Sequence, residues 1–367
     1  MLSLIVPKHV KYKDHIVKKS MLLGISMLAS TGVMAKNMVD VYGVPKKTAD
    51  AIVKKYGKQI SSISNEYMQE FKKILLGVEH QSKRDFVIEK QRLVDQIKKE
   101  NGFLFVDFGL VYYPHHINQY TTLEIIDKNS KERLRFVDAP GTYDQSLPTT
   151  KKSKDIIDEM IAYKAVGDHL MFDKDFVVKD FDCPFYHCLY GFNDKRLKPY
   201  FSKLNRAEQD KKLIVDTVNN SKNLMRQEAA TFLVGYFHDP HEIIKILLPH
   251  IKEHQSQIRN NSMRVIWSTL YKSKITTIDL KPFLEALDSP YESDRNKALS
   301  VISVAVEGEA SKKFMLQHGI DKLLANLRLV QPNNHELAYL ILKKISGKDF
   351  GDSHMKAWQQ WASSLQA

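Results

Sequence analysis

Hydrophobic residues recur at helical spacing over residues 36–102. They fall three or four positions apart, which predicts three amphipathic helices, the first opening at Pro45 and ending at Gly57, the last closing at Asn101-Gly102. The polar residues between them fit a solvated face, and no heptad holds for three repeats, which argues against a coiled coil. We therefore expect this region to be helical.

The hydrophobic period changes after residue 102. Residues 103–113 are rich in aromatic and β-branched side chains, and a second run over 121–126 leads through a polar turn into an alternating stretch over 133–137. This pattern predicts a small antiparallel sheet of two to four strands that includes a hairpin. A linker, a helix near 154–166 and a loop-rich junction with short helices are expected to complete residues 103–206.

Residues 207–367 repeat a pair of helical segments. The second segment of each pair opens with a polar residue, and an apolar residue follows four positions later. The openers are Arg226, Arg259, Arg295 and Asn334, at intervals of 33, 36 and 39. Paired helices at this interval predict an α-solenoid, in which each pair buries its apolar face against its neighbours. The expected fold class is mainly α: a C-terminal α-solenoid of HEAT-like helix pairs, preceded by a mixed α+β region.

These repeats resemble HEAT repeats, in which an Arg or Asp commonly opens the second helix of each pair. The closing segment around Trp358 and Trp361 is similar to the end of many exported bacterial HEAT-repeat proteins, and residues 183–192 are similar to a stretch that precedes their repeats. The resemblance implies a scaffold fold and says nothing of activity. The two tryptophans share one helical face, so we expect them to cap the last repeat rather than stack on a ligand.

The first 35 residues have the pattern of an export signal. Five lysines and one aspartate precede an uncharged run over residues 21–34, which ends in small residues before Lys36. The run is shorter than the ~20 residues that cross a bilayer, and no later stretch is long and apolar enough to do so. We expect a periplasmic or secreted protein of a Gram-negative bacterium, with an uncleaved N-terminal anchor as the alternative.

The two cysteines, Cys183 and Cys188, would meet oxidising conditions in an exported chain. On one continuous helix they would stand ~7.5 Å apart along the axis. A disulfide does not span that distance, so a bridge requires a turn, which Pro184 can supply. We expect a local disulfide. A metal site that adds His187, a redox-active pair and unpaired buried thiols are the alternatives.

The chain has 55 Lys and Arg against 43 Asp and Glu, a formal net charge of +12. That excess suggests a nucleic-acid partner until it is located. Residues 1–35 hold +4, residues 36–102 hold +5, residues 103–220 hold −1 and residues 221–367 hold +4. The charge is therefore not concentrated along the repeats, as a nucleic-acid groove requires, and no nucleic acid is expected as partner.

Two clusters of polar residues are candidate metal sites. The aspartates Asp168, Asp173, Asp175, Asp180 and Asp182 lack a calcium-loop pattern, so a solvated acidic loop is preferred. His115 and His116 would point to opposite faces of a strand, and a hairpin end is the default interpretation.

Known catalytic signatures are missing from the sequence. It contains no G-x-S-x-G, H-E-x-x-H or P-loop motif, so no enzyme activity and no cofactor are expected. The expected function is a non-catalytic scaffold for an unidentified protein partner. A nucleic-acid binder or DNA glycosylase-type enzyme, and a secreted effector, are the alternatives.

Overall fold

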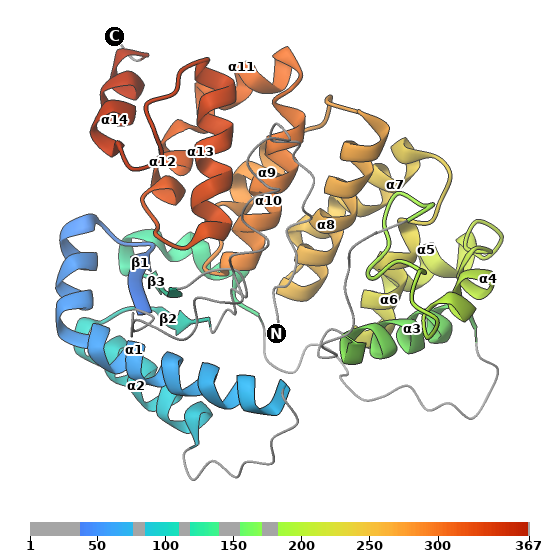
Figure 1. The fold of residues 1–367 in the computed structure, drawn as a ribbon. Coiled ribbons are helices and arrows are strands. Elements are labelled where there is room, and N and C mark those ends of the chain that lie inside the picture. The colour runs from blue at the N-terminus through green and yellow to red at the C-terminus, as the bar shows by residue number, and fades with distance from the viewer. Residues whose placement is uncertain (1–36, 76–84, 110–117, 139–154, 171–182, 366–367) are drawn as a thin grey trace, which may run out of the picture.

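A computed structural model of the chain describes residues 37–75, 85–109, 118–138, 155–170 and 183–365. The fold is mainly helical and carries one small sheet at the side of α1 and α2 (Figure 1). The expected signal over residues 1–35 lies outside the described residues. So do His115, His116 and the aspartates Asp173, Asp175, Asp180 and Asp182.

The sheet has three strands in the order β1-β3-β2. β1 (Asn37–Tyr42) pairs parallel with β3 (Gln119–Ile126), and β2 (Phe105–Phe108) pairs antiparallel with it. The expectation of an antiparallel sheet is therefore wrong for β1, which lies in a segment predicted to be helical. Parallel pairing needs a long crossover, and here α1, α2 and β2 supply it.

The predicted hairpin after β3 is also wrong. The chain forms a 3-10 helix, η1 (Lys128–Phe136), where the second strand was expected. The side chain of Asp127 accepts hydrogen bonds from the backbone N of Asn129 and the hydroxyl of Ser130, each at 2.9 Å. This cap satisfies the first turn of a helix locally, so the chain winds instead of pairing with β3.

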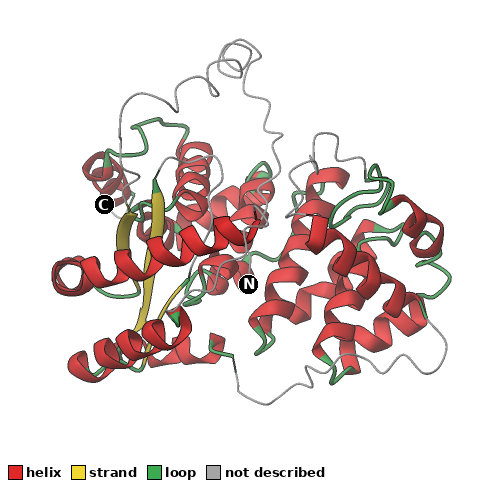
Figure 2. Ribbon diagram, turned by 60° about the horizontal axis from the view of Figure 1, so that its bottom comes forward, coloured by secondary structure: helices red, strands yellow, loops and turns green. Residues whose placement is uncertain are grey.

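Helices α1 (Lys46–Leu75) and α2 (Phe86–Asn101) pack against one face of the sheet (Figure 2). The described residues thus hold two helices here where three were predicted. α1 continues through Gly57, because one glycine costs a helix only about 1 kcal/mol. α2 ends as predicted, with Gly102 in the left-handed region at φ 67°.

The remaining helices stand side by side across the molecule (Figure 1). In chain order they are α3 (Ile156–Leu170), η2 (Lys198–Tyr200), α4 (Phe201–Leu204), α5 (Lys211–Asn220), α6 (Leu224–Val234), α7 (Pro240–Leu247), η3 (Leu248–Lys252), α8 (Ser256–Ser273), α9 (Lys281–Ala286), α10 (Glu292–Ala305), α11 (Glu309–His318), α12 (Ile320–Leu327), α13 (Pro332–Ser346) and α14 (Met355–Ser364).

Four of these helices form one layer. α6 contacts α8, α8 contacts α10, and α10 contacts α13; a second set, α5, α7, α9 and α12, packs against the same four in turn. The layer shares one continuous apolar core that runs from α3 to α14, whereas the sheet, α1 and α2 have a separate core. The two cores are therefore joined by something other than continuous apolar packing.

Candidate functional site

Residues predicted to open the repeats lie in the first turns of the layer helices. Arg226 is in α6, Arg259 in α8, Arg295 in α10 and Asn334 in α13. Arg226 joins its helix to the start of α3, because its guanidinium donates to Asp155 and Asp158, each at 2.6 Å. Arg226 therefore acts as a link between two elements of the fold.

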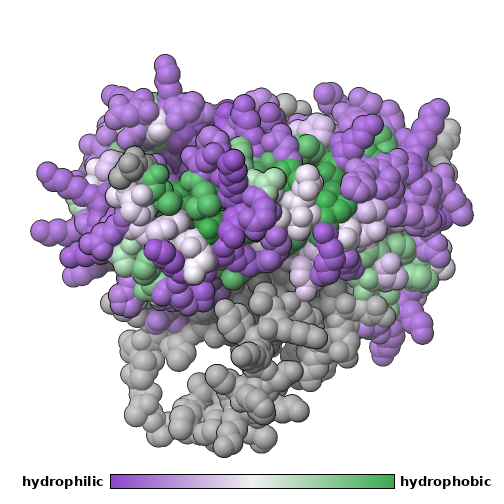
Figure 3. All heavy atoms as spheres, turned by 90° about the horizontal axis from the view of Figure 1, so that it is seen from above, coloured by the Kyte–Doolittle hydropathy of each residue, from purple (hydrophilic) through white to green (hydrophobic). Residues whose placement is uncertain are grey.

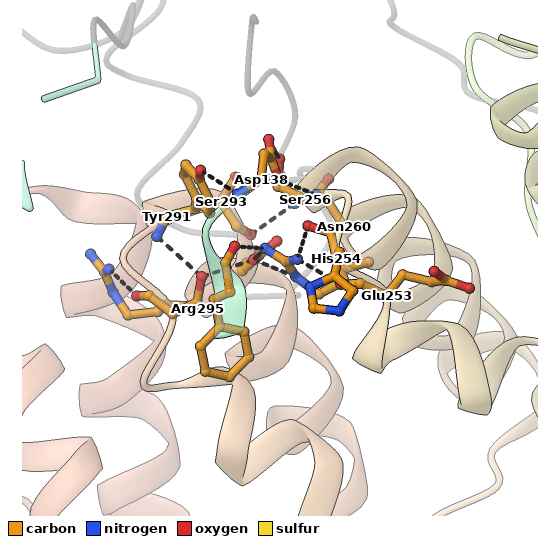
Figure 4. Close-up of polar contacts among 12 residues, drawn as sticks. Asp138, Glu253, His254, Ser256, Asn260, Tyr291, Ser293 and Arg295 are labelled. Atoms are coloured by element: carbon orange, nitrogen blue, oxygen red, sulfur yellow. Dashed lines mark hydrogen bonds and ion pairs between the residues drawn. The ribbon is translucent and has the colours of Figure 1, made fainter. Parts of the chain in front are cut away.

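Arg259 is the centre of a buried network. Figure 4 labels Glu253, His254, Ser256 and Asp138 among the residues of this region. Arg259 is 1% exposed, and its guanidinium binds the carboxylate of Asp294 on α10 at 2.8 and 3.0 Å. It also donates to the carbonyls of Glu253, His254 and Phe136 at 2.7 to 2.8 Å. One side chain thus joins α8, α10 and the end of η1, and these acceptors offset the cost of its burial.

Arg295 binds the sheet instead. Its two Nη atoms donate to the two carboxylate oxygens of Glu124 on β3, at 2.8 and 2.6 Å. The guanidinium also lies 3.8 Å from the ring centroid of Tyr42, whose hydroxyl donates to the carbonyl of Leu287. Burial raises the pKa of Glu124 to about 7, and the charge of Arg295 acts in the opposite direction.

Three acidic residues of the sheet region meet three successive helix starts. Asp138 accepts hydrogen bonds from the backbone N and hydroxyl of Ser256, the first residue of α8, at 2.7 and 2.8 Å. Glu124 binds α10 through Arg295, and Asp40 accepts from the backbone N of Val330, just before α13, at 2.6 Å. Helix N-termini carry partial positive charge, which attracts Asp138 and Asp40 at the starts of α8 and α13, whereas Glu124 meets the charge of Arg295. This polar interface is what joins the two apolar cores.

The last opener is displaced by one residue. Asn334 is fully buried, and its backbone N donates to the side chain of Gln331. The next residue, His335, has its Nδ1 2.7 Å from the carbonyl of Leu327, which precedes the helix. Arg295 reaches back in the same way to the carbonyl of Ser289, so in α13 the equivalent position is occupied by His335.

A second repeated contact lies one residue after Arg259 and Arg295. The asparagine there donates through Nδ2 to a carbonyl at the start of the next helix: Asn260 to Ser293 at 2.9 Å, and Asn296 to Asn333 at 2.8 Å. Its Oδ1 accepts from a cation of its own helix, Arg264 at 3.4 Å in α8 and Lys297 at 2.6 Å in α10. Each asparagine thus links two helices and orients a positive charge.

The structure joins Cys183 and Cys188 in a disulfide, with their Cα atoms 5.7 Å apart. The bridge closes a loop that is held to α8, because the ammonium of Lys272 donates to the carbonyls of Cys183 and Phe185. Beside this loop is a cavity of about 420 Å³. It is lined by Cys183, Pro184, Phe185, Tyr186, Tyr236, Phe237, His238 and Lys272.

The same loop inserts His187 between α6 and α8. Its backbone N donates to the carbonyl of Gly235 at 3.1 Å, and its ring stacks on Phe232. A Cβ at Gly235 would stand 2.7 Å from the Cβ of His187, a separation that real Cβ atoms do not adopt, so the close approach requires glycine. The disulfide loop therefore places one imidazole at a fixed position.

The chemistry of His187 does not suit a general base. Its Nδ1 lies 3.1 Å from the hydroxyl of Ser268, whose oxygen is also within hydrogen-bond distance of the carbonyls of Arg264 and Val265. Its Nε2 is buried and has no hydrogen-bond partner among the described residues. Burial lowers the pKa of His187 to about 3, as do the charges of Arg264, Lys272 and Lys297. A base of that pKa cannot activate Ser268 near neutral pH.

Trp358 and Trp361 lie together in α14. Their rings meet edge to face at 5.7 Å, and the Nε1 of Trp358 donates to the carbonyl of Gly351 at 2.8 Å. Both side chains are buried in the helical core, so neither ring presents a face for a ligand to stack on.

Several residues of this site were missed at the sequence level. Glu124 stands between Leu123 and Ile125, and a charged residue between apolar neighbours is a local signal of a buried ion pair. Asp294 carries no such signal, because its partner Arg259 lies 35 positions earlier. Lys297 and His187 carry no such signal, because lysine and histidine are common on solvated helix faces and loops.

Within the described ranges, no helix combines the length and apolar character needed to cross a membrane. In the same ranges, no group of three His, Cys, Asp or Glu side chains is placed to hold a metal ion. Comparison of the chain with known protein families, with curated proteins and with solved structures finds no match.

Proposed function

We propose that this chain is a non-catalytic, HEAT-type scaffold that binds a protein partner on the outer face of the layer α6, α8, α10 and α13. The observation that carries the proposal is the repeated asparagine contact, which sets one layer helix against the next at equivalent positions. A repeated inter-helix contact of this kind is what an α-solenoid of HEAT-like pairs requires, since each pair is stabilised by its neighbours.

Export from a Gram-negative cell, to the periplasm or beyond, is part of the same proposal. The bridge between Cys183 and Cys188 supports it, because disulfides persist in oxidising compartments. Intact mass of the native protein tests it directly. Loss of residues 1–35 is expected, and a full-length mass from the cytoplasmic fraction would contradict export.

The polarity of the surface and the placement of its cations indicate which class of partner it binds. Seen from above the view of Figure 1, hydrophilic side chains surround smaller apolar patches (Figure 3). Two cations of the layer, Arg264 and Lys297, are held by asparagine oxygens, and Lys297 is buried. A nucleic-acid groove presents exposed cations to phosphates and binds with strong salt dependence, so this arrangement favours a protein partner.

The scaffold is tested by capture with the full-length chain. Ser300, half-buried on α10, replaced by Trp would obstruct the layer, and exposed Lys245 on α7 replaced by Trp is the matched control. A defined envelope protein should be retained by the wild type and K245W and lost at least tenfold by S300W. Equal capture by both variants would exclude the layer as the binding face, and no specific capture by the wild type would exclude the scaffold.

A further inference from the structure

The cavity beside the disulfide loop is lined largely by aromatic rings. Its volume of about 420 Å³ lies within the range of pockets that hold small molecules. Four of its eight lining residues carry a phenyl or phenol ring: Phe185, Tyr186, Tyr236 and Phe237. The scaffold proposed above makes no use of this space, so the cavity calls for a role of its own.

The lining residues differ in depth. Tyr236 and Phe237 are 2% and 1% exposed, whereas the lining residues Pro184, His238 and Lys272 are exposed. The rings therefore form the deep part of the cavity and the more polar side chains form its rim. An apolar lining with a few polar groups is the usual composition of a small-molecule pocket.

The two chain segments that supply the rings are fixed to each other. The backbone N of His187 donates to the carbonyl of Gly235 at 3.1 Å, directly after Tyr186 and directly before Tyr236. The ring centroids of Phe185 and Tyr236 lie 4.3 Å apart. A backbone contact and a ring contact thus hold the disulfide loop against the segment that follows α6.

The disulfide keeps this space open. The bridge between Cys183 and Cys188 closes the loop, and the ammonium of Lys272 holds it by donating to the carbonyls of Cys183 and Phe185. Pro184 also fixes its own φ angle within the closed loop. A loop restrained in this way does not collapse into the cavity. The site therefore exists before a ligand arrives, and less conformational freedom is lost on binding.

We infer that this cavity binds a small, uncharged, planar aromatic molecule. Aromatic rings favour edge-to-face or offset-stacked neighbours, and the lining supplies several such neighbours for a ligand ring. No carboxylate is among the lining residues, so a cationic ligand would meet the ammonium of Lys272 without a counter-charge from the cavity. That ammonium is engaged with two backbone carbonyls, for which an anion would have to compete.

The test titrates the full-length chain by calorimetry with 2-naphthol and with its saturated counterpart, decahydro-2-naphthol. The wild type should bind 2-naphthol at least threefold more tightly, because only the planar ring makes aromatic contacts. Y186L replaces a half-buried lining ring by an aliphatic side chain and should weaken 2-naphthol binding at least threefold. The matched control Y271L removes a ring that is 42% exposed on α8 and outside the lining, and should bind within twofold of the wild type.

The disulfide supplies a second arm. Replacing Cys183 and Cys188 by Ser releases the loop and should weaken 2-naphthol binding at least tenfold. Reductant should have the same effect on the wild type, so this arm requires no substitution. Circular dichroism at the titration temperature shows that each protein compared is folded.

The inference is overturned if the wild type binds the saturated alcohol as tightly as 2-naphthol, if it binds neither, or if Y186L and Y271L bind alike. Tighter binding of choline than of 2-naphthol would replace it by a cation site. Tenfold tighter binding of the peptide acetyl-Ala-Trp-Ala-amide would assign the cavity to a side chain of a partner protein instead. None of these titrations uses the partner captured in the scaffold experiment, so this inference and the scaffold fail separately.

Discussion

Glu124 joins the sheet to α10, and the stability of the fold should depend on its protonation. The carboxylate is 4% exposed, and burial raises its pKa from 4.5 to about 7. In the unfolded chain it titrates near the ordinary value. Between these two values the folded protein holds a proton that the unfolded chain has released. The contribution of Glu124 to the free energy of unfolding is therefore complete below pH 4.5 and is lost as the pH rises toward 7.

The magnitude follows from the same two values. Each pH unit between them is worth about 1.4 kcal/mol, so the full effect is about 3 kcal/mol. Replacing Glu124 by Gln imitates the protonated form and removes the titration. We therefore expect E124Q to match the wild type at pH 5 and to be more stable than it at pH 8.

The assay is urea unfolding of both proteins at pH 5 and pH 8. Other buried carboxylates with raised pKa values, Asp40 and Asp294, titrate in both proteins and cancel in the difference. E132Q, on the exposed surface of neighbouring η1, is the control and should follow the wild type. If E124Q is less stable than the wild type at pH 8, the attraction to Arg295 outweighs desolvation and the reasoning is refuted.

Three further changes test other contacts. Replacing Cys183 and Cys188 by Ser should lower the free energy of unfolding by about 2 kcal/mol, since the closed loop is short; reductant should do the same to the wild type, and no change in either urea titration would contradict it. D138A removes the cap of α8 and should cost about 1 kcal/mol in the same assay, with D138N less affected. W361A should cost about 3 kcal/mol or more and speed amide exchange in α14 first, so uniform exchange would argue against a terminal cap.

Local signals explain what the sequence predicted well. Gly102 ends α2 because its left-handed backbone favours glycine, and Arg259 and Arg295 stand out because the same residue type recurs at the same position of α8 and α10. β1 was missed because its pairing partner β3 lies about eighty residues away. Glu124 was missed as a site residue because Arg295 is 171 positions along the chain. The cap at Asp127 is a local signal, but the alternating pattern over residues 133–137 favoured a strand instead.

The row of three acidic contacts has a mechanical consequence. In an array where each helix pair touches only its neighbours, small rotations between pairs add up along the array, and the surface bends. The sheet region binds α8, α10 and α13 near their N-terminal ends through Asp138, Glu124 and Asp40. These contacts restrain rotation between the three helix pairs. On the scaffold that we propose, this would keep the spacing of the outer face fixed before a partner binds. Less conformational freedom would then be lost on association, and tight binding would need fewer contacts.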